Sequence, residues 1–253
     1  MIIFRYDKTF DGLLTSVFDA YSRHTFPEQL LSESETLPLF VNDLYHVITQ
    51  REKSSRVFKG LQKKLSREAF HIIIYAWLSE IDKIDELIFK FILRIFDNEK
   101  SIETDLADRN ILELKKIADK VNHEKHYLQQ FTRFQKMQDN IYFAPVVPLY
   151  NALPLSLEYF KERFADQKWV IYDMKRKYGY FYDLKDISEI FIEDDKNFTD
   201  GKLNENLYDE KERLFQDLWK NYFKHITIKE RINPKLHRQN LPRRFWKYLT
   251  EKQ

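Results

Sequence analysis

The sequence predicts an α+β protein, mostly helical, in a single domain over residues 1–253 with small antiparallel β-hairpins or sheets. Three observations support this prediction. Apolar residues recur at helical spacing through the middle of the chain, shorter stretches alternate as strands do, and the two kinds of segment stand in separate blocks rather than in a βαβ repeat. The chain of 253 residues is 43% hydrophobic and 16% aromatic, which is enough to build a packed core.

The first elements follow from alternation and capping. Residues Ile2–Tyr6 predict a short opening strand. Asp7 or Thr9 can then cap a helix. The apolar side of this helix consists of Leu13, Leu14, Val17, Phe18 and Tyr21. The stretch 39–48 alternates again, with β-branched and aromatic residues, and predicts a second strand.

The longest regular pattern starts at Ser66. Apolar side chains recur every three or four residues from Phe70 to Ile95, which predicts one helix or two helices broken near Asp82 and Lys83. The same spacing predicts another helix from about residue 105 to about residue 126. Because side chains at this spacing share one face, each helix is expected to bury a stripe.

The second half of the chain returns to strand-type alternation. One hairpin is expected from residues 131–137 and 141–145, and another from residues 169–174 and 178–183 across a turn at 175–177. Ser156 is expected to cap a helix between them. Residues 188–192 predict a further strand. An amphipathic helix that includes Leu207 to Ile226 must end before Asn233, because the proline that follows disfavours helical geometry there.

Charge is distributed unevenly along a chain whose formal net charge is only +2. The basic aromatic C-terminal segment, residues 224–253, carries nine Lys or Arg against two Asp or Glu, a local charge of +7. Residues 185–217 carry eleven Asp or Glu against five Lys or Arg, a local charge of −6. Either the C-terminal segment folds back on this acidic stretch, or the two present separate faces to separate partners.

Composition excludes several classes of function. The chain has no cysteine, which excludes disulfides, thiolate catalysis and a cysteine-bound metal cluster. Its four glycines are isolated, so neither a phosphate-binding loop nor a G-x-S-x-G nucleophile elbow is present, and no cofactor is predicted. The N-terminus lacks a signal peptide and no apolar stretch is long enough to span a membrane, so we expect a cytoplasmic protein.

Two patterns raise the question of metal chemistry. His123 and His126 stand at i and i+3 near a helix end, but no third ligand accompanies them, so a solvated helix end is the favoured reading and no metal is predicted. Asp194, Asp195 and Lys196 follow an expected strand, as in nucleases whose carboxylates hold Mg²⁺ while a lysine orients the attacking water. The simpler reading of this cluster is an exposed acidic turn.

Planar and cationic side chains indicate two places for nucleic-acid binding. Tyr178, Tyr180 and Tyr182 share a strand face beside the cationic turn 175–177, where they either stack on unpaired bases or lie under a helix. Arg133, on the neighbouring hairpin, shares this ambiguity. The second place is the C-terminal segment.

In that segment, Arg243, Arg244 and Lys247 are expected to contact a ligand, since arginine can bind a phosphate through two hydrogen bonds. Phe245 and Trp246 are expected to anchor the terminus, although Trp246 can also stack on a base. The candidate nucleic-acid-binding residues are therefore Arg133, Lys175, Arg176, Lys177, Tyr180, Lys235, Arg238, Arg243, Arg244, Trp246, Lys247 and Tyr248.

Four stretches resemble a known family. They are MIIFRYDKTFDGLLTSVFDAY at the start, FTRFQ at 131–135, FAPVVPLYN at 143–151 and INPKLHRQNLPRRFWKYLTE at the end. Together they resemble a bacterial family described as probable DNA-metabolism proteins. The resemblance covers nearly the whole chain and is most specific at the two termini. Members of that family stand alone beside a radical-SAM protein, or precede a uracil-DNA-glycosylase-like domain in a longer chain.

The resemblance implies a DNA context and a protein partner, but it supplies no catalytic residue. The sequence ends at Gln253, soon after the terminal motif, so we expect no glycosylase-like part and infer no base-excision activity. Without cysteine, any radical chemistry would belong to the partner.

We therefore expect an accessory or adaptor protein in DNA repair or modification, one that binds nucleic acid and works with a radical-SAM or glycosylase-like partner. It is expected to have no independent catalytic activity and no contact with a membrane. One alternative is a metal-dependent nuclease that uses Asp194, Asp195 and Lys196. The other is a protein–protein scaffold without nucleic-acid contact.

Overall fold

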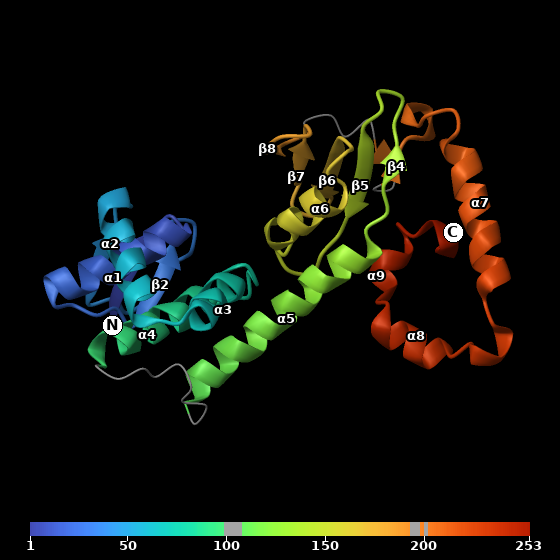
Figure 1. Ribbon diagram of the computed structural model, residues 1–253. Coiled ribbons are helices and arrows are strands. Elements are labelled where there is room, and N and C mark those ends of the chain that lie inside the picture. The colour runs from blue at the N-terminus through green and yellow to red at the C-terminus, as the bar shows by residue number, and fades with distance from the viewer. Residues whose placement is uncertain (99–107, 193–197, 200–201) are drawn as a thin grey trace. The chain divides into compact units, whose positions relative to one another are not determined.

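The computed structural model in Figure 1 describes residues 1–98, 108–192, 198–199 and 202–253. The predicted α+β class is confirmed, because the chain is 51% helical and its strands form small sheets. The chain divides into two compact units, Met1–Asn122 and His123–Gln253. Each unit is described by itself, and the single domain over residues 1–253 stays a prediction.

The first unit contains a three-stranded sheet with β1 (Ile2–Tyr6) in the centre, between β2 (Gln29–Ser32) and β3 (Asp43–His46). Both pairings are parallel, and the antiparallel hairpins of the sequence analysis were predicted for residues 131–145 and 169–183, not for this sheet. The physical reason is the connection: α1 (Phe10–Arg23) lies between β1 and β2 in the chain, and a crossover of this length returns the chain in the same direction.

The opening strand and the helix that follows it are as predicted. Thr9 is the N-cap of α1, and its hydroxyl accepts a hydrogen bond from the amide of Gly12 at 2.9 Å. Glycine is also needed at position 12 for packing. A Cβ there would lie 2.1 Å from Oδ1 of Asp7, which is too close for two atoms that are not bonded. The helix ends at His24, which adopts the left-handed conformation with φ of 52°.

Three further helices complete the core of the first unit: α2 (Arg51–Lys64), α3 (Arg67–Trp77) and α4 (Ile84–Asp97). The two helices predicted on either side of residues 82 and 83 are α3 and α4, and Ser66 caps the first of them. The side chains that meet in this core include Phe4, Leu13, Leu61, Ile73 and Ile88, all of them fully buried. The sequence analysis did not predict α2 or β2.

Helix α5 (Arg109–Phe131) begins in the first unit and ends in the second. It is followed by a five-stranded sheet in the order β4-β5-β6-β7-β8. The strands are β4 (Gln135–Lys136), β5 (Tyr142–Val146), β6 (Trp169–Asp173), β7 (Tyr178–Tyr182) and β8 (Ile187–Ile190). Both predicted hairpins are present, as β4–β5 and β6–β7.

Strands β5 and β6 pair in parallel, because the chain between them contains η1 (Pro154–Ser156) and α6 (Leu157–Arg163). Ser156 directly precedes α6 as predicted, but its side chain makes no capping hydrogen bond. The 3₁₀ turn η1 already places Ser156 in a helical conformation, and its hydroxyl donates to the carbonyl of Ala152 instead. A two-stranded sheet, β9 (Phe198–Thr199) with β10 (Lys202–Leu203), and η3 (Glu205–Leu207) follow.

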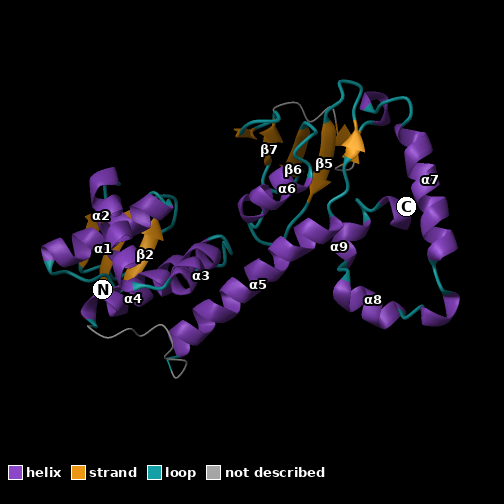
Figure 2. Cartoon of the chain, in the orientation of Figure 1, coloured by secondary structure: helices purple, strands orange, loops and turns teal. Residues whose placement is uncertain are grey.

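The end of the chain is helical (Figure 2). Helix α7 (Glu212–Ile226) leads through η4 (Lys229–Arg231) to α8 (Pro234–Asn240), α9 (Arg243–Trp246) and η5 (Thr250–Lys252). Figure 1 shows this segment running along α7, turning through α8 and returning with α9 to the end of α5. Helix α7 ends before Asn233, as predicted, and Asn233 caps α8. Within the described residues, every helix is too short or too polar to cross a bilayer.

Candidate nucleic-acid interface

Helix α9 of the C-terminal segment is attached to α5 through Arg244. Its Nε donates to Oε1 of Glu124 at 3.3 Å, and its Nη2 makes a short contact with Oε2 of the same carboxylate. Glu124 is buried, and its Oε1 also accepts the amide of Leu149 at 2.8 Å. Arg244 therefore neutralises a buried charge of its own chain, whereas the sequence analysis expected it to contact a ligand.

Aromatic packing reinforces this attachment. Phe245 is 4% exposed, and its ring lies 6.0 Å from that of Tyr127 and 5.7 Å from that of Phe131, both on α5. Leu249, in the turn that follows, is fully buried. The anchoring role predicted for Phe245 is thus present, and the end of the segment belongs to the core of its unit.

A second attachment joins the C-terminus to Arg133 and α7. Arg133 Nη2 donates to Glu251 Oε1 at 2.9 Å, and Trp219 Nε1 donates to Glu251 Oε2 at 3.0 Å. Burial acts to raise the pKa of Glu251, but hydrogen bonds from its own backbone and from these two side chains outweigh burial and lower it. Arg133, a candidate for nucleic-acid contact, therefore holds the terminus in place.

The three cations in the turn of the β6–β7 hairpin differ in their surroundings. Arg176 Nη1 lies 2.9 Å from Asp173 Oδ2 and donates to the carbonyl of Pro148 at 3.2 Å. The carboxylate of Asp173 is fully buried, so the guanidinium of Arg176 stabilises the fold by pairing with it. Lys175 and Lys177 on either side of it are exposed.

The tyrosines of β7 are mostly covered by the protein, so they offer little surface on which bases could stack. Tyr178 and Tyr182 are buried, the first donating to Asn151 Oδ1 and the second to the carbonyl of Ala165 at 3.3 Å. Tyr180 is half-buried, and burial together with the charge of Glu189 raises its pKa. Of the two readings of this stripe, the structure supports the packed one for Tyr178 and Tyr182.

The exposed cations gather in residues 224–243. Of the nine Lys and Arg in the C-terminal segment, six are exposed, and they are Lys224, Lys229, Arg231, Lys235, Arg238 and Arg243. Glu230 is the exposed carboxylate of the segment, since Glu251 is held by Arg133 and Trp219. Six cations minus one anion leave a net surface charge of +5 on this stretch. Lys247 and Tyr248 are half-buried.

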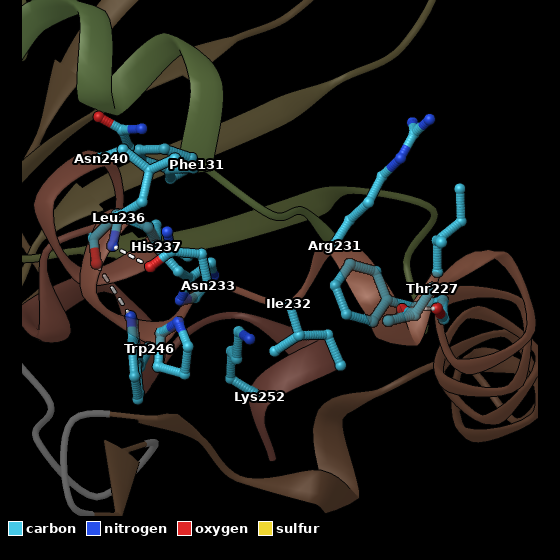
Figure 3. Close-up of a pocket in the computed structure, with 14 residues that line it drawn as sticks. Phe131, Thr227, Arg231, Ile232, Asn233, Leu236, His237, Asn240, Trp246 and Lys252 are labelled. Carbon is cyan, nitrogen blue, oxygen red and sulfur yellow. Dashed lines mark hydrogen bonds between the residues drawn. The ribbon is translucent and has the colours of Figure 1, made fainter.

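A pocket lies between α7, α8 and α9, and Figure 3 shows its lining. We call it the α7–α8 groove, with a volume of about 720 Å³. Its apolar walls are formed by Phe131, Phe223, Ile228, Ile232, Leu236 and Trp246. Trp246 Nε1 donates to the carbonyl of Leu241 at 3.1 Å, and Lys252 Nζ lies 5.5 Å from the indole ring. Partial burial and the charge of Lys252 lower the pKa of His237, which also lines the groove.

The nuclease alternative stays a prediction. Asp194, Asp195 and Lys196 lie outside the residues that the structure describes. In the described part of the chain, no three His, Asp or Glu side chains lie close enough together to hold a metal ion. His123 and His126 therefore have no third ligand among the described residues.

Sequence reasoning missed Glu124 and a buried polar cluster in the first unit. Glu124 stands between the buried Val121 and Leu128 of α5, and a carboxylate on an apolar stripe is the signal that marks it. In the first unit, Asp85 is 1% exposed, accepts the hydroxyl of Tyr6 at 2.7 Å and pairs with Lys8 at 3.1 Å.

Comparisons with known proteins give the family alone. A family described as a domain of unknown function, DUF4130, matches residues 82–251 of the chain. This match covers well over half of the sequence. Searches of curated proteins and of solved structures found no match. The description of the family assigns no activity.

Proposed function

Since this chain belongs to the DUF4130 family, whose description states no function, we propose from its surface that it is an accessory protein that binds nucleic acid. The protein holds a nucleic acid for a partner enzyme and performs no chemistry of its own. The single observation that carries the proposal is the net charge of +5 on the exposed side chains of residues 224–243.

Such a surface suits a polyanion. Ammonium and guanidinium groups that neutralise phosphates release condensed counterions, and this release provides most of the affinity of sequence-independent binding. A cationic surface on a chain whose total formal charge is only +2 is a local feature, so general basicity does not explain it.

The structure leaves fewer residues for nucleic-acid contact than the sequence predicted. Arg133, Arg176 and Arg244 each pair with a carboxylate of the same chain, which neutralises the positive charge they would offer to a phosphate. The proposal therefore rests on the exposed cations of residues 224–243, which are Lys224, Lys229, Arg231, Lys235, Arg238 and Arg243. Lys175 and Lys177 of the β6–β7 hairpin are also exposed.

The nature of the nucleic acid and of the partner comes from the resemblance to probable DNA-metabolism proteins. That resemblance favours DNA over RNA and suggests a radical-SAM or glycosylase-like protein as the enzyme that this chain assists. Enzymes that modify a base must take it out of the duplex or act on a single strand, and the role proposed for this chain is to hold the strand for such an enzyme.

The test is a titration of fluorescein-labelled single-stranded and duplex DNA with the full chain, followed by fluorescence anisotropy at about 50 to about 200 mM salt. We expect binding that weakens steeply with salt and is lost in the triple variant Lys235→Glu, Arg238→Glu, Arg243→Glu. The matched control reverses the exposed cations Lys59, Lys63 and Arg67 of the first unit and should bind as the parent does. Absence of binding, or equal losses in the two variants, would remove the proposal.

A further inference from the structure

Helix α7 exposes an apolar ridge, and Phe223 of the same helix and Thr227, its C-cap, line the α7–α8 groove. On α7 itself, Leu218, Tyr222 and Ile226 are 54%, 56% and 53% exposed. They are spaced four residues apart, so they form one ridge along the helix. A helix of a globular protein normally buries such a ridge, and a contiguous apolar surface of this kind marks an interaction site.

The groove extends this surface across the turn to α8. Its aliphatic side chains Ile228, Ile232 and Leu236 are 51%, 59% and 52% exposed. Figure 3 shows Ile232 lying across the groove from Trp246, whereas the guanidinium of Arg231 extends away from the lining. A small ligand filling 720 Å³ would leave the ridge of α7 in water, so the occupant must be longer than the groove.

The charges beside the groove restrict the occupant further. Arg231 lines it, and Lys224, Lys229, Lys235 and Arg238 are exposed on the segments that form its walls. Within residues 224–238 the exposed carboxylate is Glu230, so this stretch carries five exposed cations against one exposed anion, or +4. A second copy docked through this same face would bring the same positive charge against it, and the phosphates of a nucleic acid would not cover the aliphatic ridge.

We propose that the ridge of α7 and the α7–α8 groove together bind an amphipathic helix of a partner protein, one with acidic residues flanking its apolar face. The apolar side chains of that helix enter the groove at three- and four-residue spacing, as in other helix-in-groove complexes. Its carboxylates meet Lys229, Arg231 and the neighbouring cations, which favours an acidic helix over a basic one.

The probe is a fluorescein-labelled peptide of about 18 residues, long enough to form a helix, with leucines at helical spacing and glutamates on its flanks. A second peptide carries lysine in place of each glutamate. We expect the full chain to bind the acidic peptide with saturation, and to bind the lysine peptide weaker by about tenfold or more. Binding of both peptides with equal affinity would overturn the charge argument.

Variants separate this surface from others. Leu236→Asp is expected to weaken binding of the acidic peptide by about tenfold, whereas Leu149→Asp, at a residue of similar exposure outside the groove, leaves it unchanged. The pair Lys229→Glu, Arg231→Glu gives an independent reading that keeps the apolar lining intact, and it should also weaken binding. Circular dichroism verifies that each variant is folded.

Three results contradict the inference: no saturable binding, binding that Leu236→Asp leaves intact, or sedimentation of the parent as a dimer that Leu236→Asp dissociates. The last result would mean that a second copy covers the face. DNA binding is a separate measurement, because Leu236→Asp retains all six exposed cations of residues 224–243, so the two proposals can fail independently.

Discussion

Arg244 and Glu124 form an ion pair across 120 residues of sequence, with both carboxylate oxygens of the buried glutamate facing the guanidinium. The neighbouring Arg243 is exposed and lies 5.9 Å from the ring of Trp246. Two adjacent arginines thus have different roles, one in the fold and the other on the surface.

Replacing Arg244 with alanine leaves the carboxylate of Glu124 buried without its cation. We expect Arg244→Ala to lower the free energy of unfolding by about 3 kcal/mol, as for other buried pairs that lose one partner. Urea denaturation at pH 7 measures this loss. Arg243→Ala is the control and should change stability by less than about 0.5 kcal/mol. Similar losses in the two variants would contradict the roles assigned to these residues.

The β6–β7 hairpin makes the same distinction between neighbours. Arg176→Ala removes the cation beside the fully buried carboxylate of Asp173, and we expect it to lower the free energy of unfolding by about 3 kcal/mol. Lys175→Ala, at the exposed position before it, should cost less than about 0.5 kcal/mol. Thermal unfolding followed by circular dichroism distinguishes the two, and a larger effect at Lys175 would disprove the assignment.

Glu251 makes stability depend on pH in a specific direction. Its pKa is lowered in the folded protein, so its carboxylate contributes stability above the ordinary glutamate pKa of about 4.3, and this contribution is lost as the pH falls through the lowered value. We expect Glu251→Gln to be less stable than the parent at pH 7, and the difference to shrink with acidification below about pH 4.3.

Urea denaturation of parent and Glu251→Gln between neutral and acidic pH measures this effect. Glu230→Gln, at the exposed carboxylate of the same segment, is the matched control and should show little difference at any pH. A stability difference at Glu251 that grows with acidification would have the wrong sign for a lowered pKa.

In the first unit, the hydroxyl of Tyr6 donates to the buried carboxylate of Asp85 at 2.7 Å. Because a hydrogen bond to a buried charge is lost, Tyr6→Phe should lower the free energy of unfolding by about 1.5 to 3 kcal/mol. Tyr21→Phe removes a comparable bond of 2.6 Å to the exposed Asp97, where water can replace the hydroxyl, and should cost less. Equal losses in chemical denaturation would mean that burial of Asp85 adds nothing.

Local patterns predicted the elements whose own residues specify them. Alternation marked β1, a cap at Asp7 or Thr9 marked the start of α1, the helical spacing from Ser66 marked α3, and the turn at 175–177 marked the β6–β7 hairpin. These signals lie within a few residues of the structure they specify. Helix α2 was not predicted because it buries only Ser54, Val57 and Leu61, and so few apolar residues do not form a helical pattern in the sequence.

The sequence by itself determined the α+β class, the family to which the chain belongs, and the concentration of cations and aromatics in residues 224–253. Only the tertiary structure decided which of those cations are available to a ligand. Arg243 and Arg244 are the same residue type in the same turn, and what separates them is Glu124, which the fold alone brings to Arg244. A carboxylate is costly to bury unless a cation lies beside it, and Arg244 is that cation for Glu124. Because the two residues are 120 positions apart, no local pattern in the sequence shows that they pair.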